Sequence, residues 1–124
     1  NYQLPFFDEP EPPMANPHRE LPANQQQWLT DMASADGYII LTPEYNHAMP
    51  AGLKNAFDFL AFEGARKPAK IISYSDNMRG GQFGAAALVP VLQRLGIVVL
   101  PNQRPLVTYH KPFKVTVTLS ITRP

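Results

Sequence analysis

Three short, largely apolar runs, at residues 38–41, 70–74 and 97–100, alternate with longer segments in which apolar residues recur every three or four positions. The runs are rich in β-branched and aromatic residues, which favour strands. Continuously apolar runs of this length are typical of parallel strands that are covered on both faces. The pattern therefore predicts three strands, and residues 38–41 are expected to be covered on both faces of the sheet.

The segments between these runs predict helices at residues 23–35, 50–62 and 82–95. Pro50 suits the first position of the second helix, and Pro90 predicts a kink in the third. The apolar stripe of the second helix consists of Leu53, Ala56, Phe57, Leu60 and Ala61. Strands that alternate with helices in this way predict βαβ units and a parallel sheet with right-handed crossovers.

The two ends of the chain have different patterns. Residues 1–22 contain six prolines and predict an irregular surface connection, which we expect Leu4, Phe6 and Phe7 to anchor. Residues 106–109 either extend the last strand or add a short one. Residues 115–121 alternate apolar and polar positions, which is typical of a strand that is buried on one side.

Composition narrows the class of protein. The 124 residues suit a single domain, and 44% hydrophobic with 17% charged residues is an ordinary globular balance. A net charge of +1 gives no reason to expect a nucleic-acid or anionic-membrane partner. No apolar run reaches the roughly 18 residues of a membrane span. The absence of cysteine excludes a disulfide and fits a cytoplasmic protein, and the three histidines lack metal-ligand spacing.

Two predicted loops follow strands, at the edge of a parallel sheet where ligands bind. The first contains Pro43, Glu44, Tyr45 and Asn46, a rigid loop that can aim backbone groups and a ring at a flat heteroaromatic molecule. The second contains Ser75, Asp76, Gly80 and Gly81, where glycine allows a close approach of backbone to a ligand. From the residues alone, a well-made turn is the favoured interpretation of both loops. Arg79 and His47 are likewise explained either as ligand contacts or as surface residues.

A longer pattern runs through the first of these loops. Residues 35–46 read ADGYIILTPEYN and are followed by Pro50, by LKNA at residues 53–56 and by Asp58. This pattern closely resembles the signature of the NAD(P)H-dependent FMN reductases. Weaker similarity extends over roughly residues 4–108, at LPFFD (residues 4–8), KPAK (67–70), Ser75, Gly80-Gly81 and LGIVV (95–99).

The resemblance implies a flavodoxin-like, three-layer αβα fold and an FMN ring held by residues 43–46 and 75–81. It implies that NADPH or NADH gives a hydride to FMN N5 and that electrons pass on to a quinone, azo, metal-oxyanion or free-flavin acceptor. The flavin carries this chemistry, so no side chain is expected to act as a general acid. The resemblance also implies a homodimer or higher oligomer that pairs through the helix at residues 50–62, where we place Phe59 and Phe62 on an outer flank.

One part of the family pattern is not found in this sequence. The family begins with a strand and a Gly-Ser-x-Arg loop that binds the FMN phosphate at a helix N-terminus, and the sequence contains no such loop. We therefore expect a domain that is incomplete in its N-terminal half, with an unpaired apolar edge on the strand at residues 38–41. Two alternatives stay open: a truncated, non-catalytic subunit or interaction module, and a small domain that binds another planar heteroaromatic ligand.

Overall fold

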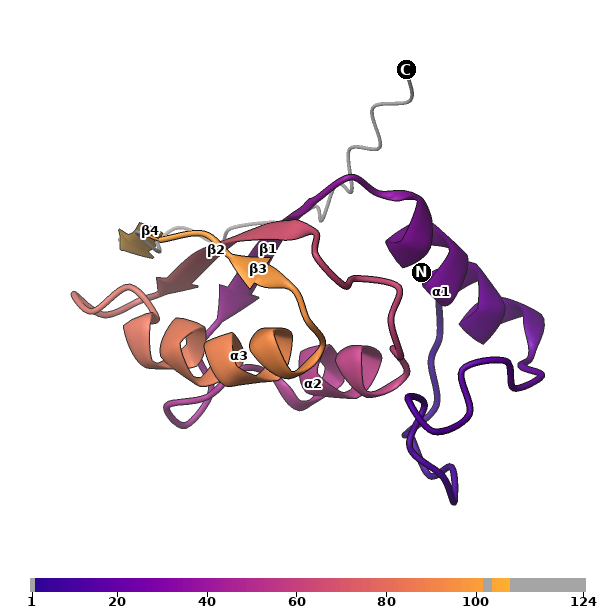
Figure 1. The fold of residues 1–124 in the computed structure, drawn as a ribbon. Helices are drawn as coiled ribbons and strands as arrows, with labels where there is room; N and C mark the ends of the chain where they lie inside the picture. Colours follow the sequence, from indigo (N-terminus) through magenta and orange to yellow (C-terminus); the bar gives the residue numbers. More distant parts are fainter. Residues whose placement is uncertain (1, 102–103, 108–124) are drawn as a thin grey trace.

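The computed structural model describes residues 2–101 and 104–107 (Figure 1). Its three helices are α1 (Ala23–Ser34), α2 (Ala51–Asp58) and α3 (Gln82–Arg94), the last with Pro90 inside it. Its four strands are β1 (Tyr38–Pro43), β2 (Pro68–Ser75), β3 (Val98–Val99) and β4 (Arg104–Val107). The predicted alternation of helices and strands is confirmed.

All strand pairs of the described sheet are parallel, and β2 lies between its neighbours. Strand β1 pairs with β2 from Tyr38↔Ala69 to Pro43↔Tyr74. On the other side, β3 pairs with the beginning of β2 and β4 pairs with its end. The chain therefore adds a short strand after residue 101, one of the two predicted outcomes. The strand predicted at residues 115–121 lies outside the described residues.

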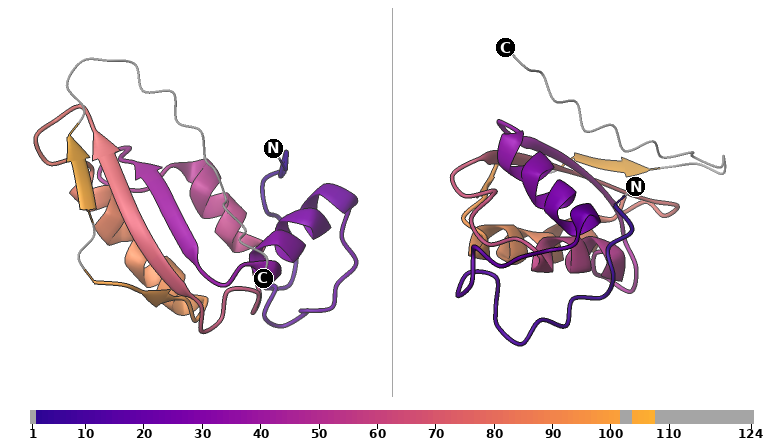
Figure 2. Two further views of the ribbon diagram at one scale, coloured as in Figure 1. Left: turned by 90° about the horizontal axis from the view of Figure 1, so that it is seen from above. Right: turned by 90° about the vertical axis from the view of Figure 1, so that its right-hand side faces the viewer.

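Helices α2 and α3 lie on one side of the sheet, and α1 lies beyond the end of the strands, beside α2 (Figures 1 and 2). Helices α2 and α3 run beneath the strands, and α1 packs beside α2, where the Trp28 indole donates to the Ala56 carbonyl at 2.8 Å. Alternate residues of β1 and β2 point into this interface and are buried: Tyr38, Ile40, Thr42, Ala69, Ile71 and Ser73. Within the described part of the chain, two of the three expected layers are present.

This arrangement corrects the prediction that β1 is covered on both faces. The side chain of Ile39 is 69% exposed, because it points away from the helices. Its neighbours Tyr38 and Ile40 are buried beneath the same strand. A continuously apolar run therefore does not guarantee two covered faces.

The predicted helix at residues 50–62 is also wrong in its second half. Helix α2 ends at Asp58, and the chain then turns so that Phe59 and Leu60 enter the core, at 1% and 2% exposure. The ring of Phe59 packs edge-on against Phe7, with centroids 5.2 Å apart. Phe59 therefore cannot lie on an outer helix flank, whereas Phe62, beyond the helix, is 57% exposed.

The proline-rich connection is fixed to the body by a few contacts. Asn55 accepts the Phe7 backbone N–H at 2.8 Å and donates to the Pro5 carbonyl at 2.7 Å. The Tyr2 hydroxyl donates to the Asp31 carboxylate at 2.6 Å. Phe7 is thus an anchor as expected, but Phe6 is 81% exposed and is not. Among residues 2–101 and 104–107, no helix is long and apolar enough to cross a bilayer.

Candidate functional site

The two predicted loops leave the same edge of the sheet. Pro43 ends β1 and is aligned with Tyr74, one residue before β2 ends at Ser75. Because the strands are parallel neighbours, the loop after β1 and the loop after β2 begin side by side (Figure 1). The two loops therefore leave neighbouring strands at the same edge, and their convergence on one binding pocket stays a prediction.

Glu44 joins the first loop to helix α3. Its carboxylate accepts hydrogen bonds from the backbone N–H groups of Phe83 and Gly84, at 2.9 and 3.1 Å. These N–H groups lie in the first turn of α3, where no intrahelical acceptor exists. Glu44 therefore caps α3 across 39 residues of sequence. Its carboxylate is used in this cap, so its role is to position the two loops.

Gly84 allows this close approach. A Cβ atom at residue 84 would lie 3.1 Å from the Ala48 carbonyl oxygen and 3.2 Å from both the Glu44 Cα and the Pro43 carbonyl oxygen. Only glycine therefore fits without displacing the first loop. Sequence reasoning missed Phe83 and Gly84, although a third glycine shortly after Gly80-Gly81 was a usable signal.

The first loop contains a tight turn. Tyr45 and Ala48 exchange two backbone hydrogen bonds, both 2.9 Å long. The two residues between them, Asn46 and His47, have φ values of 49° and 62°, in the left-handed region that Asn tolerates well. This turn leaves the Tyr45 ring 63% exposed at the edge of the sheet. Burial, together with the nearby Tyr45, raises the pKa of Tyr74 on the neighbouring strand.

The second loop is shaped by its own polar groups. The Ser73 hydroxyl donates to the Gly80 carbonyl at 2.9 Å. The Asn77 side-chain oxygen accepts from the Arg79 backbone at 2.9 Å and from the Ser75 hydroxyl at 3.0 Å. Ser75 and Gly80 therefore order the loop, and Asn77, which sequence reasoning did not single out, organises its centre.

Gly81 is required by the backbone at the start of α3. It has a φ of 76°, and a Cβ atom there would lie 2.7 Å from the Tyr74 carbonyl oxygen. Of the eight predicted binding residues, three therefore present exposed side chains at this edge: Tyr45, Asn46 and Asp76. The other five shape the loops that hold them: Pro43, Glu44, Ser75, Gly80 and Gly81.

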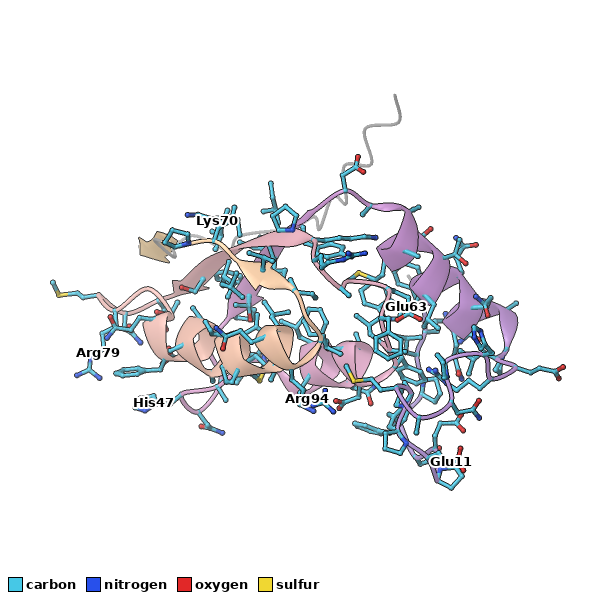
Figure 3. The ribbon with its side chains drawn as sticks, in the orientation of Figure 1. Glu11, His47, Glu63, Lys70, Arg79 and Arg94 are labelled. Atoms are coloured by element: carbon cyan, nitrogen blue, oxygen red, sulfur yellow. The ribbon has the colours of Figure 1, made fainter. Side chains whose placement is uncertain are left out.

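A cluster of rings and one cation lies at the outer end of the two loops. The His47 imidazole stacks on the Phe83 ring, with centroids 4.4 Å apart and planes 27° from parallel. The Arg79 guanidinium carbon lies 5.5 Å from the centroid of the same ring. Arg79 and His47 are both at the loop end of the sheet (Figure 3).

Comparison with known proteins identifies the family. A sequence model of the family described as NADPH-dependent FMN reductase matches residues 1–111. The chain belongs to this family. It is 37% identical over 95 residues to an NAD(P)H-dependent FMN reductase of Nectria sp., and 35% identical over 102 residues to one of Schizosaccharomyces pombe. These alignments cover 75% and 82% of the chain but 46% and 50% of the relatives, so the chain spans about half of their length.

A solved structure supports the fold. The flavoenzyme FerB of Paracoccus denitrificans, an NAD(P)H:acceptor oxidoreductase, superimposes with a TM-score of 0.74 at 22% identity. The superposition covers 87% of the chain and 59% of FerB. The predicted flavodoxin-like α/β fold is therefore confirmed.

Proposed function

We propose that this chain forms the flavin-ring side of an FMN-dependent NAD(P)H oxidoreductase. FMN, when bound, would accept electrons from NADPH or NADH and deliver them to a small acceptor such as a quinone, an azo compound, a metal oxyanion or free flavin. The observation that carries the proposal is the Glu44 cap on α3. It makes the loops after β1 and β2 one rigid rim in a family whose members reduce FMN.

The residues present fit the ring end of the cofactor. Tyr45, 63% exposed beside the rim, offers an aromatic surface, and Asn46 offers amide groups. Gly80 and Gly81 bring the second loop back against β2, where Gly81 has no room for a side chain. The chain therefore contributes position and shape, and we assign no catalytic residue.

Membership of the family also supports proposals about the cellular location, the oligomeric state and the partners of the protein. We propose a cytoplasmic enzyme that works as a homodimer or higher oligomer, with the nicotinamide nucleotide and the acceptor as its small-molecule partners. Phe59 no longer supports pairing through α2, because it lies in the core. The outer edge of β1, which pairs with no other strand among the described residues, is the better contact surface.

The direct experiment is to mix the purified chain with FMN and NADPH and to follow NADPH oxidation and flavin absorbance. We expect weak FMN binding, with similar affinity for riboflavin, because the sequence has no Gly-Ser-x-Arg loop for the phosphate. Oxidation should require FMN and should fall when Tyr45→Ala removes the exposed ring. Submicromolar FMN binding would contradict the weak-binding part, and no binding of either flavin would contradict the proposal.

A second candidate, a non-catalytic interaction module, is favoured by one observation. Beside β1 lies a largely apolar cavity of about 170 Å³, lined in part by Trp28, Ile39 and Leu41. Within the described residues β1 pairs only with β2, so its outer edge and this cavity are open to another strand. Flavin binding separates the two candidates, because a module of this kind needs none.

A further inference from the structure

The side chains of His47, Arg79 and Phe83 form a cluster at the outer end of the two loops, and the proposed function gives these side chains no role. We propose that this cluster binds the 2′-phosphate of NADPH, so that this rim prefers NADPH to NADH. The assignment rests on the proposed function for its substrate. The proposal adds that the 2′-phosphate is the group by which the site distinguishes NADPH from NADH, and that Arg79 is the residue that recognises it.

The geometry of Arg79 suits a phosphate. Its guanidinium carbon lies 5.5 Å from the centroid of the Phe83 ring, close enough for a cation–π contact. In residues 2–101 and 104–107 it forms no ion pair with a carboxylate, although the residue is exposed. A guanidinium that has no acidic partner in this part of the chain is able to form paired hydrogen bonds with a phosphate monoester.

Separate contacts hold the backbone that carries the cluster. Glu44 accepts the Phe83 backbone N–H, and Asn77 accepts that of Arg79. His47 stacks on the Phe83 ring from the turn of the first loop. A backbone fixed in this way needs little rearrangement when a phosphate binds, which favours affinity and selectivity.

Position and charge favour the nucleotide as the source of the phosphate. The cluster lies on the loops that we assign to the flavin ring, at their outer end (Figure 3). A cosubstrate that reacts at the ring must extend past this rim, and its 2′-phosphate is the group that distinguishes NADPH from NADH. Asp76 is the acidic residue within residues 75–81, and its side chain is exposed. Its negative charge would repel a phosphate bound at Arg79.

Direct binding tests the assignment without FMN. Adenosine 2′,5′-bisphosphate and 5′-ADP are titrated separately into the ¹⁵N-labelled chain, and amide shifts are followed by NMR. We expect the 2′-phosphate ligand to bind at least about tenfold more tightly, as paired charge-assisted hydrogen bonds provide. Arg79→Ala should reduce this ratio to about one, Arg79→Lys should leave part of it, and Asp76→Asn should increase it.

The matched control is Arg66→Ala, which removes an exposed arginine from the loop before β2, at the opposite end of that strand. It should leave the ratio unchanged, and circular dichroism should show that each variant is folded. Equal affinity for the two ligands, or a ratio that survives in Arg79→Ala, would overturn the assignment. A third outcome would also overturn it. If Arg79→Ala weakened the binding of FMN but not of riboflavin and left the nucleotide ratio unchanged, Arg79 would bind the phosphate of FMN and not the 2′-phosphate of NADPH. Failure of the proposed function is a different result, namely no shift with either flavin.

Discussion

The carboxylate of Glu44 accepts the backbone N–H of Phe83 at 2.9 Å, across 39 residues of sequence. A single side chain thereby joins the loop after β1 to the helix that follows β2. The loops are the two that the family resemblance assigns to the flavin, but the contact itself is a helix cap. The geometry of the binding rim and the stability of α3 therefore depend on the same carboxylate.

Removing this cap should destabilise the protein. We expect Glu44→Ala to lower the free energy of unfolding by about 1–2 kcal/mol, because two N–H groups of the first turn of α3 lose a charged acceptor. Glu44→Gln keeps an acceptor oxygen and should cost less. Chemical denaturation measures both, and Glu11→Ala, at an exposed position, is the control. Equal stability of Glu44→Ala and Glu11→Ala would show that the cap contributes nothing.

Two glycines should respond to alanine in opposite directions. Gly81→Ala forces a positive φ and a contact of 2.7 Å with the Tyr74 carbonyl oxygen, so it should cost more than about 1 kcal/mol. Gly52 lies inside α2 with nothing within 4 Å of an added Cβ, so Gly52→Ala should stabilise by roughly 0.5–1 kcal/mol. Thermal unfolding of the two variants compares them directly. A stabilising Gly81→Ala would mean that the second loop does not have the described backbone.

Stability should fall in strong alkali through Tyr38. Burial, together with the charge of Glu63, raises the pKa of its hydroxyl to about 12, and the hydroxyl donates to the Met32 carbonyl at 2.7 Å. A pKa that is higher in the folded state favours the protonated form there. The contribution is therefore complete below the unfolded value near 10 and is lost as the pH rises to about 12.

Tyr38→Phe isolates this effect. It should lower stability by about 1 kcal/mol at neutral pH, where the hydrogen bond is lost. Its stability should then decline less than that of the parent protein between about pH 10 and 12. Denaturant unfolding across that range gives both values. Tyr2, whose pKa is also raised to about 12 by burial and by its hydrogen bond to Asp31, contributes in the same direction and remains in the variant. Parallel curves for variant and parent would contradict the assignment to Tyr38.

Association should depend on the edge of β1. Light scattering at micromolar concentration should report a species larger than 13.8 kDa. Ile39→Lys places a charge on the exposed side of that strand and should shift the protein towards the monomer. Phe62→Ser removes an exposed aromatic outside α2 and should leave the association unchanged. If Phe62→Ser gave the monomer and Ile39→Lys left the association unchanged, the contact would lie in the region after α2 and not at β1.

Much of this fold follows from local pattern. Apolar period and glycine position predicted the order of elements, and the register of β1 and β2 places the two loops at the same edge of the sheet as expected. The end of α2 was not predictable by period, since Leu60 and Ala61 continue the helical spacing although the helix ends at Asp58. The role of Glu44 was not predictable for a related reason. Glu44 and the Phe83 N–H that it caps are 39 residues apart, so the contact depends on how the segments after β1 and β2 pack, and no local spacing in the sequence indicates it.

We propose that the loops after β1 and β2 hold the flavin ring. Titration of riboflavin into the ¹⁵N-labelled chain, followed amide by amide, tests this proposal because it detects weak binding and locates it. We expect saturable shifts at Glu44, Tyr45, Asn46 and residues 75–81, with FMN giving the same pattern. Shifts confined to other regions, such as the cavity beside β1, or no shift with either flavin at millimolar concentration would contradict it.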